Sequence, residues 1–218
     1  MKKQNIFEAL LAYHEFVEPL LAAQLSKHSN IITLRKGSTI IKEKQYIKSF
    51  IILLEGHIRV WKERNEKEIT LYYISPFETC AYSIVALEKQ YQSLVNAKVI
   101  SEKAMLIKIP IEKIQDWNNY PSWQKFIRNN LIDKYECILE CIQNLAFKKV
   151  EERLLNYLYD FSINYQSKDI NISHSKLANE IGTSREVVSR TLKYFEKKGV
   201  LKLNYKKIKI IQKINLCD

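Results

Sequence analysis

Residues 172–199, ISHSKLANEIGTSREVVSRTLKYFEKKG, decide how the rest of the chain is interpreted. They predict two short helices joined by a tight turn. Ser173 is a favourable N-cap for the first helix, and Gly182 tolerates the left-handed backbone that often ends one. Thr183 or Ser184 then caps a second helix, which continues almost to the end of the stretch. The pattern therefore predicts a helix-turn-helix.

The second helix has two chemically different faces. At about 100° per residue its apolar and its charged side chains fall on opposite sides of the helix axis. The packing face consists of Ser184, Val187, Val188, Thr191, Leu192 and Phe195. The opposite face presents Arg185, Glu186, Ser189, Arg190, Lys193 and Lys197. A helix fits the major groove of DNA, where Arg binds guanine O6 and N7 and Glu accepts from cytosine N4. An ordinary amphipathic surface helix gives a similar pattern, but the capped helix before it and the basic hairpin after it favour DNA.

The segment SREVVSRTLKYFEKKGVL, with ISHSKLANEIG before it, resembles the helix-turn-helix of the Crp/Fnr family of bacterial transcription regulators. Residues 186–190, EVVSR, are similar to the E-x-x-S-R motif of the Fnr branch, and Arg185 stands where the Crp branch also has an arginine. The resemblance implies that helix 184–198 enters the major groove and that the base-reading residues are Arg185, Glu186, Ser189 and Arg190. It also implies a homodimer on a palindromic double-stranded DNA operator, with RNA polymerase as a candidate partner.

The charge of the chain agrees with a polyanionic partner. The net charge is +11 over 218 residues, and it is unevenly distributed. Residues 148–218 hold 15 Lys and Arg against 8 Asp and Glu, a net +7, which leaves +4 for residues 1–147. The basic excess is therefore concentrated in the part that contains the helix-turn-helix, as nucleic-acid binding requires.

The sequence predicts a cytoplasmic protein without a membrane span. It has no uninterrupted apolar run near the roughly 20 residues that a transmembrane helix needs. The N-terminal MKKQNIFEALLAY reads as an amphipathic helix, since Glu8 interrupts its apolar run and no small-residue cleavage site follows. The four cysteines do not suggest a disulfide framework, and a cytosol would keep them reduced: Cys80, Cys137, Cys141 and Cys217.

Ahead of the DNA-binding part, the pattern predicts helices over residues 4–27, with a break near Pro19, and then strands from Ile31 onward. The predicted strands are IITL (31–34), STIIK (38–42), SFIILLEG (49–56), HIRVWKE (57–63), EITLYYI (68–74), SLVNAKVI (93–100) and AMLIKIP (104–110). Seven or eight short strands at this spacing predict a β-sandwich or barrel. The order resembles the cyclic-nucleotide-binding β-roll of the same family, with residues 35–37 (RKG) as an early turn and residues 54–60 (LEGHIRV) as its strand-Gly-strand signature. The implied sensor domain is 1–118.

A long helix is predicted to follow a short one at 111–117. Its apolar residues recur at spacings of 4, 3, 4 and 3, a heptad seam that requires a facing helix: Leu131, Tyr135, Ile138, Ile142 and Leu145. At 1.5 Å per residue, roughly 25 residues extend close to 40 Å, which is long for a helix within one small domain. In the resembling family this is the dimerisation helix, here 119–147. The alternative is an amphipathic helix that lies on its own β-roll.

The fold class is therefore α+β: an N-terminal antiparallel β-roll, a long dimerisation helix and, over 148–218, a winged helix-turn-helix. Another amphipathic helix, 148–165, opens this last domain. After Gly199, VLKLNYKKIKIIQK predicts two short strands that form a wing. Phosphate contacts position a protein on DNA without reading sequence. Candidates for them are Ser173, Thr183, Ser184, Lys193, Lys202, Lys206 and Lys207.

The effector segment departs from the family pattern. A cyclic-nucleotide phosphate is a buried anion that needs an Arg and backbone N–H groups at a Gly-containing turn, with a Glu for the ribose. The family's phosphate-binding motif has Gly-Glu near its start and Arg-Ser/Thr near its end. When this motif is aligned without gaps to residues 78–98, Gly-Glu falls on Ala81 and Tyr82 and Arg falls on Gln92. Only the hydroxyl residue is retained, as Ser93. Residues 77–99 contain no Gly and no Arg. Cyclic AMP is therefore not expected.

The same segment is apolar and aromatic. It either holds an uncharged or weakly polar ligand or forms a collapsed core with no ligand at all. The candidate pocket residues are Tyr72, Cys80, Ala81, Tyr82, Gln92 and Ser93.

No cofactor or metal site is predicted. The family's iron–sulfur members hold the cluster with cysteines that lie mostly near the N-terminus, whereas the first cysteine here is Cys80, a candidate thiol switch. Cys137 and Cys141 lie one helical turn apart, which fits a metal, a dimer thiol pair or two small interface residues. The histidines lack ligand spacing, and haem binding through His57 stays an alternative to a structural role.

The rival function is a ligand- or redox-sensing regulatory module that does not bind DNA. The base-reading face of helix 184–198 argues against it. An enzyme is not expected, because the sequence shows no Gly-rich phosphate loop, no Ser/His/Asp grouping and no paired metal ligands.

Overall fold

The computed structural model describes Glu8 and residues 10–11, 16–64, 67–88, 92–164, 167–204 and 207–212. The expectations for Lys206 and Cys217 therefore lie outside the described residues. Two compact units are present, residues 1–62 with 71–139 and residues 63–70 with 140–218. None of the helices in the described part is both long and apolar enough to span a lipid bilayer.

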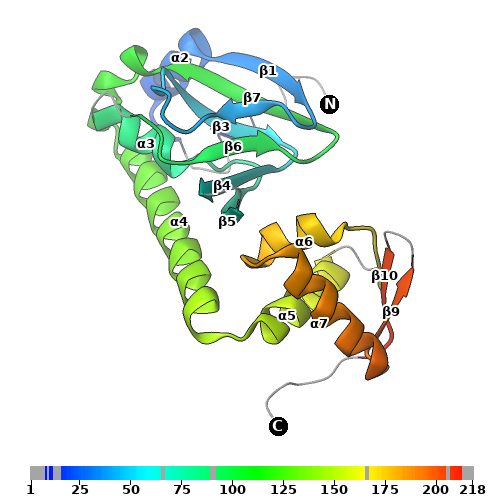
Figure 1. Ribbon diagram of the computed structural model, residues 1–218. Coiled ribbons are helices and arrows are strands. Elements are labelled where there is room, and N and C mark those ends of the chain that lie inside the picture. Colours follow the sequence, from blue (N-terminus) through cyan, green and yellow to red (C-terminus); the bar gives the residue numbers. More distant parts are fainter. Residues whose placement is uncertain are drawn as a thin grey trace. The chain divides into compact units, whose positions relative to one another are not determined.

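The first unit is built on two antiparallel sheets (Figure 1). One sheet has the order β1-β7-β3 and the other the order β2-β6-β4-β5. Their strands are β1 (Asn30–Arg35), β2 (Thr39–Ile41), β3 (Ser49–Glu55), β4 (Ile58–Arg64), β5 (Lys67–Ile74), β6 (Asn96–Val99) and β7 (Lys103–Pro110). All seven strands predicted from the sequence are present.

The core between the sheets follows from the alternation of side chains along each strand. The inward-facing apolar residues of both sheets share one cluster, which includes Ile51, Leu53, Val60 and Leu106. In the register of the three-stranded sheet, Leu106 lies opposite Ile32 of β1 and opposite Leu53 of β3. The two sheets therefore pack face to face, as a β-roll requires.

A second cluster covers the outer face of the three-stranded sheet. Helix α2 (Pro19–His28) contributes Leu21 and Leu25, and the start of α4 (Pro121–Phe147) contributes Trp123 and Phe126. Trp123 is fully buried, and its ring centroid lies 5.3 Å from that of Phe50. Buried aromatic pairs contribute about 0.5–1.5 kcal/mol each beyond their burial. This cluster attaches the start of the long helix to the sheet.

Glu18 fixes where α4 begins. Its carboxylate accepts hydrogen bonds from the Ser122 backbone N–H, at 3.0 Å, and from the Ser122 hydroxyl. These two bonds lower the pKa of Glu18. The 3-10 turns η1 (Ile111–Lys113) and η2 (Gln115–Asn119) precede α4, where the sequence predicts a short helix. Helix α3 (Ala81–Glu88) is not predicted, because its apolar residues show almost no helical periodicity.

Gly56 is predicted to be the glycine of the β-roll that tolerates substitution least. Its φ is +97°, and an added Cβ would lie 2.6 Å from both the Lys103 carbonyl oxygen and the Ser101 hydroxyl. Gly56→Ala should lower the free energy of unfolding by about 3 kcal/mol, from backbone strain and overlap together. Gly37→Ala is the matched control: φ is +84° but nothing lies within 4 Å of the added Cβ. We expect it to cost only about 1 kcal/mol; urea denaturation that ranks the two variants in the opposite order would contradict the structure.

The second unit contains a helical domain with a small sheet of order β8-β10-β9. Its elements are α5 (Val150–Asn164), β8 (Asp169–Ile170), α6 (His174–Ile181), α7 (Arg185–Lys197), β9 (Leu201–Asn204) and β10 (Lys207–Ile210). One apolar core joins them, with Leu154, Leu177, Leu192 and Ile208 among its buried members. Helices α6 and α7 lie side by side next to the β9–β10 wing (Figure 1). A winged helix-turn-helix is therefore present, as predicted.

Candidate nucleic-acid interface

The turn between α6 and α7 is held by the caps that the sequence suggests. The Ser173 hydroxyl accepts from the Lys176 N–H at 3.2 Å, and the Ser184 hydroxyl accepts from the Val187 N–H at 3.4 Å. Gly182 ends α6 with φ +66° and ψ +49°. An N-cap contributes about 1 kcal/mol to its helix. These contacts orient the first turn of α7, where the predicted base-reading residues begin.

Helix α7 has the two faces expected of it. Val188, Thr191, Leu192 and Phe195 are buried against the domain core. The exposed side chains on the other face include Arg185, Glu186, Arg190, Lys193 and Lys197. The predicted base readers therefore share one solvent-accessible surface, with the exception of Ser189.

Ser189 is partly buried beside His174, the first residue of α6. The two side chains form a hydrogen bond of 2.8 Å between Nδ1 of the imidazole and the Ser189 hydroxyl oxygen. Burial lowers the pKa of His174, and the positive charge of Arg185 lowers it further. A neutral His174 can orient the Ser189 hydroxyl from the side of α6. Sequence reasoning did not identify His174, because this contact depends on how the two helices cross.

Glu186 stays ionised at neutral pH. Its pKa is lowered by a hydrogen bond from its own backbone N–H, then by the Ser184 hydroxyl, and further by Arg185. The free N–H groups at the start of a helix favour a carboxylate there. Glu186 is therefore an acceptor-only group at the exposed N-terminus of α7, which is the chemistry required to receive a cytosine amino hydrogen.

The predicted phosphate contacts differ in their surroundings. Lys193 and Lys202 are exposed, whereas Lys207 makes an ion pair of 2.9 Å with Asp169. Both side chains of this ion pair are about two-fifths exposed, so the pair is weak. Lys207 can therefore leave Asp169 and bind a DNA phosphate instead. Thr183 is partly buried, and its backbone N–H already donates to Ala178 at 3.0 Å.

Three residues of the predicted effector pocket, Tyr72, Cys80 and Ser93, lie inside the core of the β-roll. Tyr72 and Cys80 are buried, with the phenol oxygen 3.5 Å from the cysteine sulfur. Burial raises the pKa of both groups, so the Cys80 thiol is protonated at neutral pH, a poor state for a thiol switch. Ser93 is fully buried and donates to the Val95 carbonyl. The segment therefore forms packed core around these residues.

The remaining residues of that segment lie at its edges. Ala81 and Tyr82 open α3 and are partly buried, while Gln92 is exposed and forms an isolated β-bridge with Tyr46. Neither the Tyr82 nor the Gln92 side chain carries the charge that the family's cassette has at these places.

Lys134 of α4 is a buried cation that sequence reasoning missed. Its ammonium lies 2.5 Å from the Glu78 carboxylate and 5.5 Å from the centre of the Tyr72 ring. Nearby, the buried Thr79 N–H donates to the Asn130 side chain at 3.0 Å. Helix α4 thus connects to the segment before α3 through charged and polar side chains of the protein itself.

Removing the Lys134 ammonium is predicted to destabilise the β-roll. The Lys134 side chain is 3% exposed and that of Glu78 is 31% exposed. Without the ammonium, the partly buried Glu78 carboxylate would lose its ion-pair partner and remain largely shielded from water. Lys134→Met should lower the free energy of unfolding by about 2 kcal/mol, less than for a fully buried pair. The double variant Lys134→Met/Glu78→Gln should recover more than half of that loss in urea denaturation. Equal stability of Lys134→Met and the parent would contradict this assignment.

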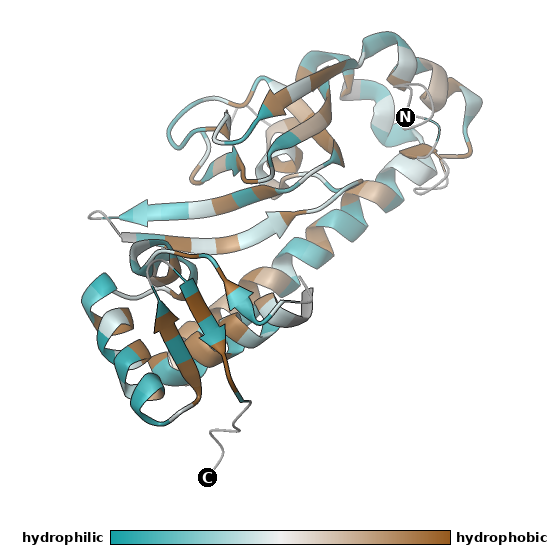
Figure 2. Ribbon diagram, turned by 90° about the vertical axis from the view of Figure 1, so that its right-hand side faces the viewer, coloured by the Kyte–Doolittle hydropathy of each residue, from teal (hydrophilic) through white to brown (hydrophobic). Residues whose placement is uncertain are grey.

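One face of α4 is apolar and exposed. Leu131, Ile132, Tyr135, Leu139 and Ile142 are between 39% and 63% exposed. Apolar and polar residues follow one another along the whole ribbon of this helix (Figure 2). Of the remaining predicted seam residues, Ile138 packs partly buried against the β-roll core and Leu145 lies against Gly182. Ile132 and Leu139 are the exposed residues of this face that the heptad pattern did not select.

The cysteines of α4 have ordinary surroundings. Cys137 packs partly buried against the β-roll core, and Cys141 lies 3.5 Å from the Thr70 carbonyl oxygen. Burial raises the pKa of Cys141. Among the described residues, no three His, Cys, Asp or Glu side chains come together as metal ligands.

A β-roll, a long helix and a winged helix-turn-helix with an arginine- and glutamate-bearing face define a DNA-binding regulator. Residues 152–218 match the family model of the Crp-like helix-turn-helix domain. The C-terminal part of the chain is therefore a Crp-like helix-turn-helix domain, and the chain as a whole is similar to transcription regulators of the Crp/Fnr family.

The chain is similar over most of its length to several bacterial regulatory proteins. The chain is 24% identical over 201 residues to the anaerobic regulatory protein of Aggregatibacter actinomycetemcomitans, covering 86% of this chain and 76% of that protein. It is 23% identical over 195 residues to the fumarate and nitrate reduction regulatory protein of Vibrio cholerae, covering 85% and 76%.

Solved structures share the fold. A Crp/Fnr-family regulator from Eubacterium rectale has a TM-score of 0.82 at 21% identity and covers 91% of this chain and 92% of its own. The c-di-GMP-responsive global regulator CLP of Xanthomonas campestris has a TM-score of 0.76 at 18% identity, covering 90% and 100%.

Proposed function

We propose that this regulator binds a palindromic operator as a homodimer, with α7 of each protomer in the major groove. The observation that carries the proposal is the exposed face of α7, where Arg185, Glu186 and Arg190 project from a capped helix whose other face is buried. Arg and Glu are the side chains that distinguish G·C from the other base pairs. A module that only senses ligands has no need of such a face.

The exposed apolar face of α4 supports the homodimer. Several large apolar residues in one stripe are typical of a surface that another helix covers. The second copy is the occupant that also explains DNA recognition, because two recognition helices read a palindrome in successive major grooves. RNA polymerase is the further partner that we propose, and the cytoplasm is the proposed location. Activation or repression would then follow from where the operator lies relative to the promoter.

We also propose that cyclic AMP is not the effector of this regulator. Two polar groups of the segment already have partners within the protein: the Glu78 carboxylate is paired with Lys134, and the Ser93 hydroxyl donates to the Val95 carbonyl. In addition, residues 77–99 contain no arginine that could bind the phosphate of a cyclic nucleotide. Cyclic AMP at millimolar concentration should leave operator affinity unchanged. A tenfold or greater change in that affinity would overturn this part of the proposal.

Titration of labelled genomic fragments at several salt concentrations tests DNA binding itself. Binding should weaken steeply with salt, with a slope of log K against log salt near −0.9 for each phosphate contact. Lys202→Ala should reduce the steepness of that slope by about 0.9. Lys113→Ala, at an exposed lysine outside the DNA-binding domain, should leave the slope unchanged. If the protein retards no fragment at low salt, the alternative of a regulatory module without DNA binding is correct.

A further inference from the structure

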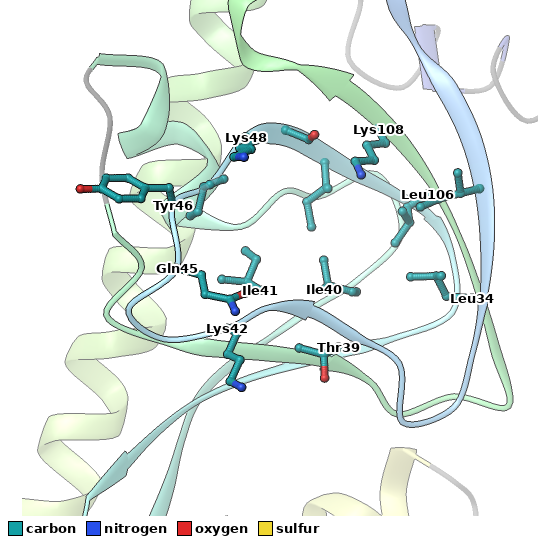
Figure 3. A pocket seen from close by; sticks show the side chains of 14 residues that line it. Leu34, Thr39, Ile40, Ile41, Lys42, Gln45, Tyr46, Lys48, Leu106 and Lys108 are labelled. Atoms are coloured by element: carbon teal, nitrogen blue, oxygen red, sulfur yellow. The ribbon is translucent and has the colours of Figure 1, made fainter.

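A cavity of about 360 Å³ opens between the two sheets of the β-roll (Figure 3). Its lining comes from β1, β2, β3, β7 and the loop 42–48. None of the lining residues belongs to α3 or α4, so the cavity is separate from the segment in which an effector was expected. The volume falls within the range of small-molecule sites in proteins, about 300–1,000 Å³.

The interior of the cavity is apolar. Leu34 and Leu106 project into it from one side, and Ile40 projects toward them from the strand opposite (Figure 3). Ile32, which lies opposite Leu106 in the sheet register, extends the same surface. These side chains are continuous with the core between the sheets, yet Ile32, Leu34 and Ile40 are only partly buried. A hydrocarbon chain would complete their burial.

The edge of the cavity is cationic. Lys108 lies opposite Ile51 in the register and therefore on the inward face of the sheet, and Lys48 lies on the same side of the cavity (Figure 3). Lys42 is a third lining lysine, and the lining contains no carboxylate. The adjacent acid, Glu43, is held by Lys62 at 2.5 Å. Within the described part of the chain, none of the three lining lysines is paired with a carboxylate.

The loop that forms one wall is fixed by backbone contacts. The Lys44 N–H donates to the Ser93 carbonyl at 2.8 Å, and the Ser93 N–H donates to the Gln45 carbonyl at 2.9 Å. Lys44 adopts a left-handed backbone with φ +64°, which is unfavourable for a residue with a side chain. Such strain persists only where the surroundings enforce it, and it is concentrated at ligand sites. The wall is therefore preorganised.

We propose that this cavity binds an anionic amphiphile, a carboxylate with a linear hydrocarbon chain. The carboxylate would lie between the Lys48 and Lys108 ammonium groups, and the chain would extend along Ile32, Leu34, Ile40 and Leu106. A nucleotide fits less well, because the one aromatic side chain of the lining, Tyr46, is 56% exposed at the edge. The proposal adds a ligand site to the regulator and does not depend on how it binds DNA.

Isothermal titration calorimetry of the full chain with hexanoate, octanoate and decanoate, each below its micelle concentration, tests both halves of the site. Affinity should rise about fourfold for each added CH₂ group until the cavity is full. Decanol, which has the same chain without the charge, should bind about tenfold more weakly than decanoate. A chain-length series with constant affinity, or no binding of any member at millimolar concentration, overturns the proposal.

Substitutions locate the ligand. Lys48→Met and Lys108→Met should each weaken decanoate binding roughly fivefold, in the range of exposed charge pairs. Lys113→Met, at an exposed lysine outside the cavity, is the matched control and should change nothing. Ile40→Trp should abolish binding by filling the interior, with its thermal unfolding compared with that of the parent. Unchanged decanoate affinity in both lysine variants would contradict the assigned position of the carboxylate, even if Ile40→Trp fails to fold.

Discussion

Replacing Arg190 with alanine is expected to weaken operator binding by about 1–3 kcal/mol per half-site, roughly 5- to 150-fold. Arg190 is exposed on α7, so the substitution removes a base contact without disturbing the core beneath it. The loss should be selective. Discrimination should relax at one base pair in each half-site and stay intact at the others, as measured by binding to a set of single-base operator variants.

One control variant separates base reading from the general effect of charge. Lys193→Ala removes one positive charge from the same exposed surface of α7. We expect it to weaken binding to all sequences equally and to flatten the salt dependence by about 0.9. If Arg190→Ala behaves like Lys193→Ala, with uniform weakening and an unchanged base preference, Arg190 contacts phosphate and the assignment of α7 as the recognition helix loses its main support.

The second large effect is expected from the exposed face of α4. Leu139→Glu should prevent the proposed homodimer from forming, because a carboxylate in a buried apolar seam is left unpaired. Affinity for a full palindromic site should then fall by about 10²–10⁴, since the two recognition helices no longer act as one molecule. Sedimentation velocity measures the first effect and fluorescence anisotropy the second.

Ile138→Glu provides the matched comparison one residue away. Ile138 is partly buried against the β-roll of its own protomer, whereas Leu139 is exposed. Ile138→Glu should therefore reduce thermal stability, while Leu139→Glu should leave the fold of each protomer intact. A Leu139→Glu protein that still sediments as a dimer at micromolar concentration would show that this face of α4 is not the seam.

The fold was largely predictable because local patterns and tertiary packing agree. The seven β-branched and aromatic runs became β1 to β7. Ser173 and Gly182 define the two ends of α6, and Ser184 defines the start of α7. Helix α3 was not predictable, because its buried residues include Ser83, Ile84 and Ala86 and lack a clear period. A helix that is packed on several sides has no single apolar face, so its sequence lacks the 3.6-residue hydrophobic period by which helices are predicted.

The candidate site was predictable where it depends on a single helix. The faces of α7 follow from 100° per residue, whereas the contact between His174 and Ser189 depends on how two helices meet. Lys134 illustrates the same limit. Its spacing on α4 gives no sign that it is buried against Glu78, a residue 56 positions away in the sequence. The heptad pattern likewise selected Ile138 in place of Leu139, since both lie near the edge of the stripe.

Selection of binding sites from random-sequence DNA by the purified full-length protein tests the central claim most directly. A homodimer that reads DNA with α7 should enrich an inverted repeat whose two identical half-sites are centred about one helical turn apart, 10–10.5 base pairs. The enriched half-sites should contain a G·C pair whose preference disappears in the Arg190→Ala protein. Enrichment of no motif, or of a single half-site without its inverted copy, would contradict the account.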